Sequence, residues 1–550
     1  PPPPPPGGPP GGPPPPPPPP RTRASVSFAP SRRSRDDHLG RVACRSVAST
    51  VFAVALLGCG RDHSGVTDVD VARSIVPSFS VRFPADQPPL QKSLRFVDHP
   101  DRVPGRYLIK LASENSDPAS SVRAISELEG VRIISDMRGF GLVWVEASDR
   151  AVSSLLDRPN VEFVEAEIEF RVAGVGDTTV AVDQSSIRNA LDRVDQRSRP
   201  LDGQYVYSAT GQGVHVWIVD NGVNQLDSRL AGRVSTTHSF THAGKDPLVS
   251  CDGHGTGMAV HAAGISGQGV AHASMVHSAR VDGSSCKNLS QGAVIDALYH
   301  IALTSPRPVV ANLSFSLPCP PFFGCPWSVR TAVAHAVAAG VTIVGAAGQT
   351  DGGLGADACN EAPAAYEDAI AVAAANPLTD VQHAYSNYGP CVDLYAPVDG
   401  GNGTSAASAI TTGVAALFLQ WYPNASPGQV RSWLLSNATV NSLVVFPGSP
   451  NLLLHSRPPA LQAWISGVEE VGPVATCTWY LEHLGGQPPY SVVWYRSGYA
   501  SQAGSSWSSP GGESHPFELL AIVTDGVGRT ASGTRSVGIN WNDHSFLCGQ

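Results

Sequence analysis

The segment GNGTSAASA, residues 401–409, places Ser405 between a glycine-rich turn and a run of small residues that suits a helix. A serine hydroxyl is a weak nucleophile unless a base takes its proton and hydrogen-bond donors receive the developing negative charge. The alternative interpretation is that Ser405 is a polar residue in a turn. Nucleophilic chemistry at Ser405 therefore requires that the chain also supply a base, an orienting acid and an oxyanion donor.

Two other segments contain an acid and a base. In GVHVWIVDNGV, residues 213–223, an apolar run ends at Asp220, and a carboxylate at the end of a buried strand needs a donor. In CDGHGTGMAVHAAG, residues 251–264, His254 lies between two glycines that allow backbone and substrate to approach the ring. Each segment is a weak signal alone, because the chain has 17 histidines. Together they offer an acid, a base and a nucleophile.

The elements that must position these residues alternate along residues 184–457. Apolar runs such as PVVANLSFS and GVTIVGAAG suit buried strands, whereas AASAITTGVAALFLQWY suits a helix that begins at the nucleophile, over 405–421. This alternation predicts an α/β fold in which helices cover both faces of a mainly parallel sheet. Sites in such folds lie where strands end and glycine-rich loops follow.

The regions on either side have different patterns. Residues 104–175 show the order βαββαβ of a small ferredoxin-like α/β module. Residues 460–550 contain short alternating runs between Gly, Pro and Ser turns, which predict a small β-sandwich that resembles immunoglobulin-like or PKD-like domains. In that sandwich we expect Trp494 to pack in the core behind Cys477.

The N-terminal hundred residues are not expected to form a core. Residues 1–40 are Pro/Gly-rich and basic and are predicted to be disordered, and residues 60–103 suit a linker. Residues 41–59 suit a secretory signal peptide whose end, LLGC, resembles the lipobox of bacterial lipoproteins. The chain is therefore expected to be secreted or held at the cell envelope, with membrane attachment through a lipidated Cys59. The alternative is an ordinary signal peptide.

Composition narrows the function classes. The net charge of −9, without a basic stripe or a P-loop, gives no indication of nucleic-acid binding. Ten cysteines suit an oxidising compartment if they pair in space. Cys251 and His254 form a Cys-x-x-His without a second pair of ligands, which does not favour a zinc site.

The ordered motifs GHGT, NLSFS, GAAG, SNYGPCVDLYAP and GTSAAS resemble the subtilisin-like serine proteases, in the proteinase K and aqualysin branch. The chain order Asp220, His254, Ser405 is also the subtilisin order. The resemblance covers residues 104–457 and implies a subtilisin-like three-layer fold. It implies an endopeptidase for extended polypeptides, made as a zymogen whose propeptide, 104–175, inhibits the enzyme until a cut near 172–183.

The resemblance also implies roles for individual residues. Ser405 would attack the scissile carbonyl, His254 would move its proton, and Asp220 would orient the imidazole. Gln349 stands where the family has an oxyanion-binding Asn, and its amide reaches one methylene further. The residues expected to bind substrate are Leu313, Ser314, Phe315, Ser316, Gly345, Ala346 and Ala347.

Three departures leave a second interpretation open. Gln349 replaces Asn, Ser316 and Leu317 replace paired glycines, and the segment between Pro397 and Gly403 is short. These changes could weaken the enzyme. The alternative is an envelope-associated, protease-like binding protein with weak or no peptidase activity.

Cysteines and one acid complete the set of site residues. The resemblance implies the pairs Cys251–Cys286 and Cys359–Cys391, and elimination leaves Cys319–Cys325 and Cys477–Cys548. Asp393 matches a structural calcium ligand of the proteinase K branch, although it could also be an acid in a surface turn. The chemistry itself is expected to need no cofactor.

Overall fold

The structure is a computed structural model. It describes residues 92–112, 117–172, 184–242, 244–319, 324–350, 353–400, 403–458, 461–472, 475–486, 489–496, 501–509, 515–526 and 528–539. The predicted disordered segment, the signal peptide with Cys59, the cut region after Val172 and Cys548 lie outside these residues. Within them, no helix has the length and apolar character needed to span a bilayer.

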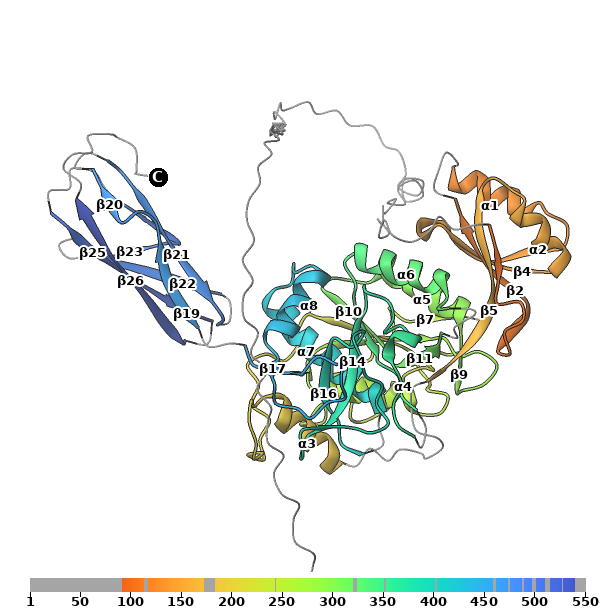
Figure 1. Cartoon of the computed structure of the whole chain (residues 1–550), viewed down its shortest axis with the longest axis horizontal. Helices are drawn as coiled ribbons and strands as arrows, with labels where there is room; N and C mark the ends of the chain where they lie inside the picture. The colour runs from red at the N-terminus through yellow and green to blue at the C-terminus, as the bar shows by residue number, and fades with distance from the viewer. Residues whose placement is uncertain are drawn as a thin grey trace, which may run out of the picture. The chain divides into compact units, whose positions relative to one another are not determined.

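A mainly antiparallel sheet with two helices forms the N-terminal module, drawn in orange in Figure 1. Its elements are β1 (Leu94–Arg95), β2 (Arg102–Leu111), α1 (Pro118–Ser126), β3 (Val131–Met137), the short helix η1 (Arg138–Phe140), β4 (Leu142–Ala147), α2 (Asp149–Leu156) and β5 (Val161–Val172). The order β5-β2-β4-β3 gives a ferredoxin-like sheet. Helix α1 begins after Asp117, whose carboxylate accepts the N–H groups of Ala119 and Ser120.

The strands begin earlier than the sequence suggested. β1 lies inside the range 60–103 that we assigned to a linker, and β2 starts at Arg102. β1 is a strand because it pairs with β5, where Leu94 lies opposite Val164. Two residues are too few for an alternating pattern, so the sequence alone could not indicate this strand.

The central region is an α/β unit. Its first elements are α3 (Gln184–Val194), β6 (His215–Asp220), β7 (Phe240–Thr241), α4 (His254–Ala263), β8 (Met275–Arg280), β9 (Asn288–Ser290), α5 (Gln291–Thr304), β10 (Val309–Leu313) and β11 (Phe315–Pro318). They are followed by α6 (Trp327–Ala338), β12 (Thr342–Ala346), η2 (Ala358–Asn360), β13 (Glu361–Ala362), β14 (Ile370–Asn376), β15 (Val381–Gln382) and β16 (Leu394–Pro397). The last are α7 (Gly403–Trp421), α8 (Pro427–Ser436), β17 (Thr439–Val440) and β18 (Leu452–Leu453).

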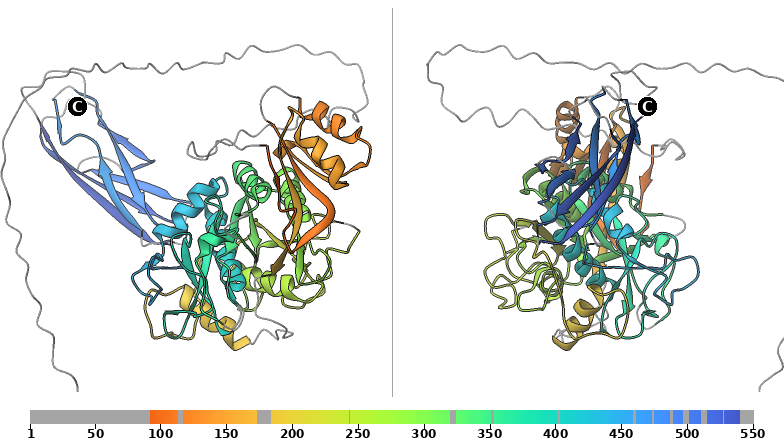
Figure 2. Two further views of the ribbon diagram at one scale, coloured as in Figure 1. Left: turned by 45° about the vertical axis from the view of Figure 1, so that its right-hand side comes forward. Right: turned by 90° about the vertical axis from the view of Figure 1, so that its left-hand side faces the viewer.

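These elements form three layers. The main sheet has the order β17-β18-β16-β14-β12-β10-β6-β8-β7, and its central strands from β16 to β7 are parallel (Figures 1 and 2). Side chains alternate across β6, so Val216 and Ile218 pack in the core with α4 and α7. Trp217 and Val219 face the opposite core, which contains α5 and α6. This confirms the predicted α/β fold class.

The C-terminal region consists of two small sheets with a shared core. Its strands are β19 (Gln462–Ser466), β20 (Glu470–Val471), β21 (Thr478–Leu484), β22 (Ser491–Arg496), β23 (Gln502–Ala503), β24 (Ser506–Ser508), β25 (Phe517–Thr524) and β26 (Thr530–Ile539). One sheet is β19-β21-β24 and the other is β20-β26-β25-β22-β23. Trp479, Trp494 and Trp507 are buried in the core with Cys477.

Disulfides connect loops around the central sheet. The structure contains Cys251–Cys286, Cys319–Cys325 and Cys359–Cys391, which are three of the expected pairs. Cys477 is also disulfide-bonded, to a partner outside the described residues. The first bridge ties the loop before α4 to the loop after β8, and so fixes the chain beside His254.

Candidate active site

Asp220 and His254 meet at the end of a central strand. Asp220 is the last residue of β6 and is fully buried. Its two carboxylate oxygens each lie 2.9 Å from Nδ1 of His254, and one also accepts the backbone N–H of Asn221 at 2.8 Å. This geometry orients the imidazole and favours the tautomer in which Nδ1 carries the proton.

Local glycines allow α4 to approach β6. Gly253 precedes the helix with φ of +94°, a conformation that favours glycine. A Cβ on Gly255 would lie 2.4 Å from the carbonyl oxygen of Gly222 and 3.1 Å from Cβ of Asp220. The glycines around His254 therefore allow the helix to pack against the strand, in addition to the access for substrate that the sequence suggested.

The charges around His254 favour its protonated form. Burial acts to lower the pKa of the imidazole, but the charge and hydrogen bond of Asp220, with a further contribution from Asp252, raise it above its ordinary value. One oxygen of Asp252 also accepts the His254 backbone N–H at 2.9 Å. A raised pKa suits a group that must hold a proton between two steps of a reaction.

Ser405 lies in the first turn of α7. The helix begins at Gly403, two residues before the expected start at 405, so Ser405 is its third residue. Its N–H is among the first four of the helix, which have no acceptor within the helix, and the helix dipole adds positive potential there. The side chain of Ser405 is fully buried.

Ser314 links the nucleophile helix to β11. The Ser405 hydroxyl donates to the Ser314 carbonyl oxygen at 3.1 Å, and the Ser314 hydroxyl donates to the Ser405 carbonyl oxygen at 3.0 Å. Nε2 of His254 is buried and has no hydrogen-bond partner among the described residues. The base is thus oriented by Asp220, whereas the Ser405 hydroxyl is hydrogen-bonded to a backbone carbonyl.

Gln349 lies next to the start of the same helix. Its Oε1 accepts the Thr404 N–H at 3.1 Å, while its Nε2 is buried without a partner in the described part of the chain. Gly403, with φ of +66°, is needed here because a Cβ would lie 2.1 Å from Oε1 of Gln349. A buried N–H donor without an acceptor beside Ser405 is the chemistry that an oxyanion site requires.

The end of β5, a strand of the N-terminal module, lies between two strands of the central region. On one edge of β5, Val172 pairs with Phe315 of β11, and on the other edge Phe170 pairs with Leu289 of β9 (Figure 1). The rings of Phe170 and Phe315 stack with centroids 5.7 Å apart. An extended segment is thus held between β9 and β11 by backbone pairing on both of its edges.

The predicted substrate-binding residues fall into two groups. Phe315 and Ser316 pair directly with β5, and Ser314 connects them to Ser405. The others are buried in the central sheet or at its edge: Leu313, Gly345, Ala346 and Ala347. Sequence reasoning missed β9, because a three-residue strand shows no periodicity and its pairing partner is remote in the sequence.

Comparison with known proteins agrees with this arrangement. The family model described as "Subtilase family" matches residues 211–457. The chain is 35% identical over 407 residues to the extracellular serine proteinase of Thermus sp. strain Rt41A, covering 66% of this chain and 91% of that protein. The chain belongs to the subtilase family. It is a subtilisin-like serine endopeptidase.

Two further comparisons extend this result for the subtilase chain. It is 34% identical over 325 residues to alkaline serine exoprotease A of Vibrio alginolyticus, covering 56% of this chain and 57% of that protein. Fervidolysin from Fervidobacterium pennivorans, described as a keratinolytic enzyme related to subtilisin, matches in structure with a TM-score of 0.51 and 17% identity. That match covers 79% of this chain and 73% of fervidolysin, and it supports the fold alone.

Both carboxylate oxygens of Asp393 in this subtilase have protein partners. Its Oδ1 pairs with the guanidinium of Arg431 in α8, and its Oδ2 accepts the Ala371 N–H at 2.9 Å. An arginine thus supplies the positive charge that a calcium ion would bring. No cluster of three or more His, Cys, Asp or Glu suited to a metal occurs in the described ranges. The calcium ion stays an untested prediction.

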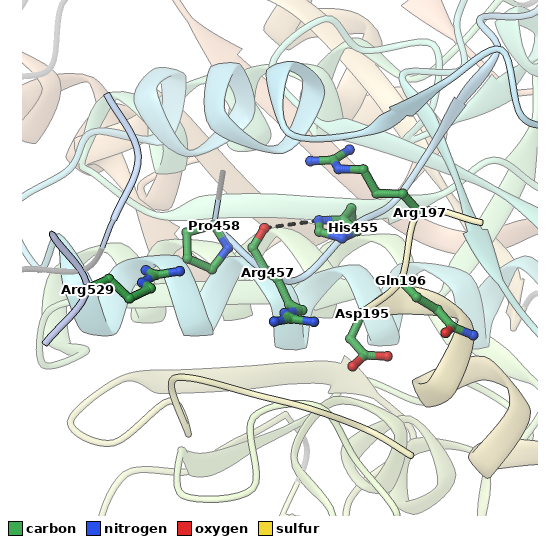
Figure 3. Close-up of a pocket in the computed structure, with 7 residues that line it drawn as sticks. All are labelled: Asp195, Gln196, Arg197, His455, Arg457, Pro458 and Arg529. Atoms are coloured by element: carbon green, nitrogen blue, oxygen red, sulfur yellow. Dashed lines mark hydrogen bonds between the residues drawn. The ribbon is translucent and has the colours of Figure 1, made fainter. Parts of the chain in front are cut away.

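A separate pocket contains none of the predicted site residues. Figure 3 shows its lining, which includes Asp195, Arg197, His455 and Arg457. Burial raises the pKa of Asp195 to about 6, and one of its oxygens accepts the Val206 N–H at 2.7 Å. Nothing in this pocket resembles a nucleophile with its base, so we assign it no part in peptide hydrolysis.

Proposed function

We propose that the chain hydrolyses peptide bonds of extended polypeptides through Asp220, His254 and Ser405, and that it is made as a self-processing zymogen. The observation that carries the proposal is the 2.9 Å contact between the Asp220 carboxylate and Nδ1 of His254, while Nε2 has no partner in the part of the chain that the structure describes. In this mechanism Nε2 takes the Ser405 proton as Oγ attacks the scissile carbonyl, and later gives it to the leaving amine.

The oxyanion would be stabilised by two donors. One is the Ser405 N–H at the start of α7, and the other is Nε2 of Gln349. The orientation of the Gln349 amide supports this role. Its Oε1 accepts the Thr404 N–H at 3.1 Å, so its Nε2 is not used in that contact and can donate to an oxyanion. The longer side chain of Gln is therefore compatible with the role that the family gives to Asn.

The N-terminal module would act as an intramolecular inhibitor, because its β5 strand fills the groove that a substrate needs. Burial of Trp144 against Gly292 at the start of α5 strengthens the contact, since a Cβ on Gly292 would lie 2.2 Å from the indole. Glu165 adds to it by accepting the N–H groups of Trp327 and Ser328 at 2.8 and 3.1 Å, at the start of α6. The cut that releases the module is proposed within 172–183, directly after β5.

Self-processing of the purified precursor tests this proposal. We expect the wild-type chain to separate into an N-terminal fragment and a mature enzyme, with a new N-terminus between 172 and 183. Ser405→Ala should leave the precursor intact, while a matched Ser436→Ala variant in the exposed end of α8 should mature normally. Processing that does not depend on Ser405 would favour the alternative, a protease-like binding protein.

We also propose that the enzyme acts outside the cell or at its envelope. This rests on the signal-like segment 41–59 and on a relative that is named an extracellular proteinase. Lipidation of Cys59 would hold it at a membrane. Incorporation of labelled fatty acid that is lost in Cys59→Ser would support the anchor, and equal incorporation in both would contradict it.

A further inference from the structure

The side chain of Glu361 carries a polar atom that the proposed mechanism does not use. Glu361 is the first residue of β13, which pairs with β11 through Pro318. Its Oε2 is buried and has no hydrogen-bond partner, and no cation of the described residues forms an ion pair with it. A buried carboxylate oxygen that has no partner of its own is costly in a folded protein and commonly indicates a functional site.

The position of Glu361 relates it to the bond that is cut. Gly348, the residue directly before Gln349, packs closely against Glu361: a Cβ added to this glycine would lie 3.1 Å from Cγ of Glu361. On the other side, the hydroxyl of Ser316 in β11 faces the carboxyl group. Glu361 therefore lies between the proposed oxyanion residue and the strand that pairs with the bound chain.

The register of the groove identifies the substrate residue concerned. Ser405 Oγ donates to the Ser314 carbonyl oxygen, so a substrate residue opposite Ser314 would present its carbonyl to the nucleophile. Residues two apart on a strand point to the same face. Ser314 and Ser316 therefore point to the same face, and so does the side chain of a substrate residue opposite Ser314. Glu361 lies on this face as well, because it is opposite Pro318 in the pairing of β13 with β11.

We propose that Glu361 is a specificity-determining residue that selects substrates with an arginine or lysine directly before the scissile bond. This inference rests on the proposed function. A cationic side chain would pair with Oε2 of Glu361, which has no partner among the described residues, while Ser316 would hold the carboxylate in place. Ser316 occupies a position where the family pattern has glycine. The same replacement would therefore supply the hydroxyl that holds the Glu361 carboxylate.

The electrostatics of Glu361 support the same conclusion. Burial raises the pKa of its carboxyl group to about 7, and the hydrogen-bonding effect of Ser316 only partly opposes it. Neither Ser316 on β11 nor Gly348 after β12 titrates, so Glu361 itself would ionise near neutral pH. Because the ionised form attracts a cation, the preference for arginine should grow as the pH rises through this range.

The inference concerns chains that are cleaved in trans. In the precursor the residue after Val172 is Ala173, whose methyl group carries no charge and cannot pair with a carboxylate. Self-processing therefore does not test the role of Glu361, and a set of short peptides does.

The test compares peptides that differ only in the residue before the scissile bond, which is Arg, Lys, Gln, Leu or Glu. The matured full chain is first titrated with a fluorophosphonate to count active sites. We expect kcat/KM for Arg to exceed that for Gln by at least about tenfold near pH 8, and this ratio to fall near pH 6. Titration of His254 affects both peptides equally and cancels in the ratio.

Three variants make the test specific. Glu361→Gln should reduce the Arg-to-Gln ratio to within about threefold and abolish its pH dependence. Glu361→Asp should retain part of the preference, and Glu367→Gln, a matched loss of charge at a largely exposed side chain, should retain all of it. Because the ratio is taken within one preparation, a variant that folds poorly still gives a valid value.

Each result supports or overturns the inference. If the enzyme is labelled and cuts peptides but prefers Leu or Gln, or if Glu361→Gln keeps the wild-type ratio, Glu361 does not select the substrate while the proposed function stands. If the protein is neither labelled nor active on any peptide, the proposed function fails and this inference fails with it.

Discussion

The two halves of the candidate site differ in how completely their polar groups are paired. Asp220 and His254 form a closed acid–base pair, held by hydrogen bonds of 2.9 Å at the end of β6. The half that would meet the substrate has groups without partners among the described residues, namely Nε2 of His254 and Nε2 of Gln349. Its serine hydroxyl is bonded to the Ser314 carbonyl instead.

This difference has a physical reason. The acid–base pair needs no substrate, because a buried carboxylate and an imidazole satisfy each other. An oxyanion donor such as Nε2 of Gln349 must be kept ready for a charge that exists only in the transition state, which agrees with its lack of a partner among the described residues. We therefore expect substitutions in the two halves to reduce kcat by different factors.

The largest effect should come from the acid–base half. Asp220→Asn keeps the shape of the side chain but presents an amide to Nδ1, which favours the wrong imidazole tautomer, and kcat should fall by about 10⁴-fold. Peptide hydrolysis by protein matured with a trace of wild-type enzyme measures this. Asp227→Asn, an acid that pairs with Arg229, is the matched control and should stay near the wild-type rate. If kcat of Asp220→Asn fell by less than tenfold, the acid–base half would not have the larger effect that we expect.

The substrate-facing half should show an intermediate effect. Gln349→Ala removes one oxyanion donor, and kcat should fall by about 10²–10³-fold with little change in KM. Gln349→Asn restores an amide and should recover part of the loss. An unchanged kcat in Gln349→Ala would mean that the amide takes no part, and the oxyanion would then rest on the helix N–H alone.

The smallest effect concerns the charge around His254. The base must be neutral to take a proton, so kcat/KM is lost as the pH falls through the raised pKa of His254. Asp252→Asn removes a negative charge that contributes to this increase, and the acid limb of the pH profile should move to lower pH by a few tenths of a unit. A shift in the opposite direction would contradict the charge assignment.

The sequence was sufficient for features that depend on local patterns or on strong motifs. The run that ends at Asp220 predicted a strand end, which occurs at the last residue of β6. The pair Cys251–Cys286 followed from the family resemblance and is present. The alternation of strand-like and helix-like runs predicted the α/β fold class.

Features that depend on tertiary contacts could not be predicted. β9 is a strand because β5 pairs with it. The surroundings of Glu361 include Ser316 and Gly348, which are separated from it in the sequence. Asp393 looked like a calcium ligand, yet Arg431 approaches it from α8. Residue type indicates what a side chain can bind, but only the fold determines which partner reaches it.

The most direct test of the account is covalent labelling of the matured protein with a fluorophosphonate, followed by identification of the labelled peptide by mass spectrometry. We expect one label on Ser405 in the wild-type chain, and strongly reduced labelling in His254→Ala, because Nε2 can no longer take the proton. Labelling at another serine, or equal labelling of Ser405 with and without His254, would contradict the proposed triad.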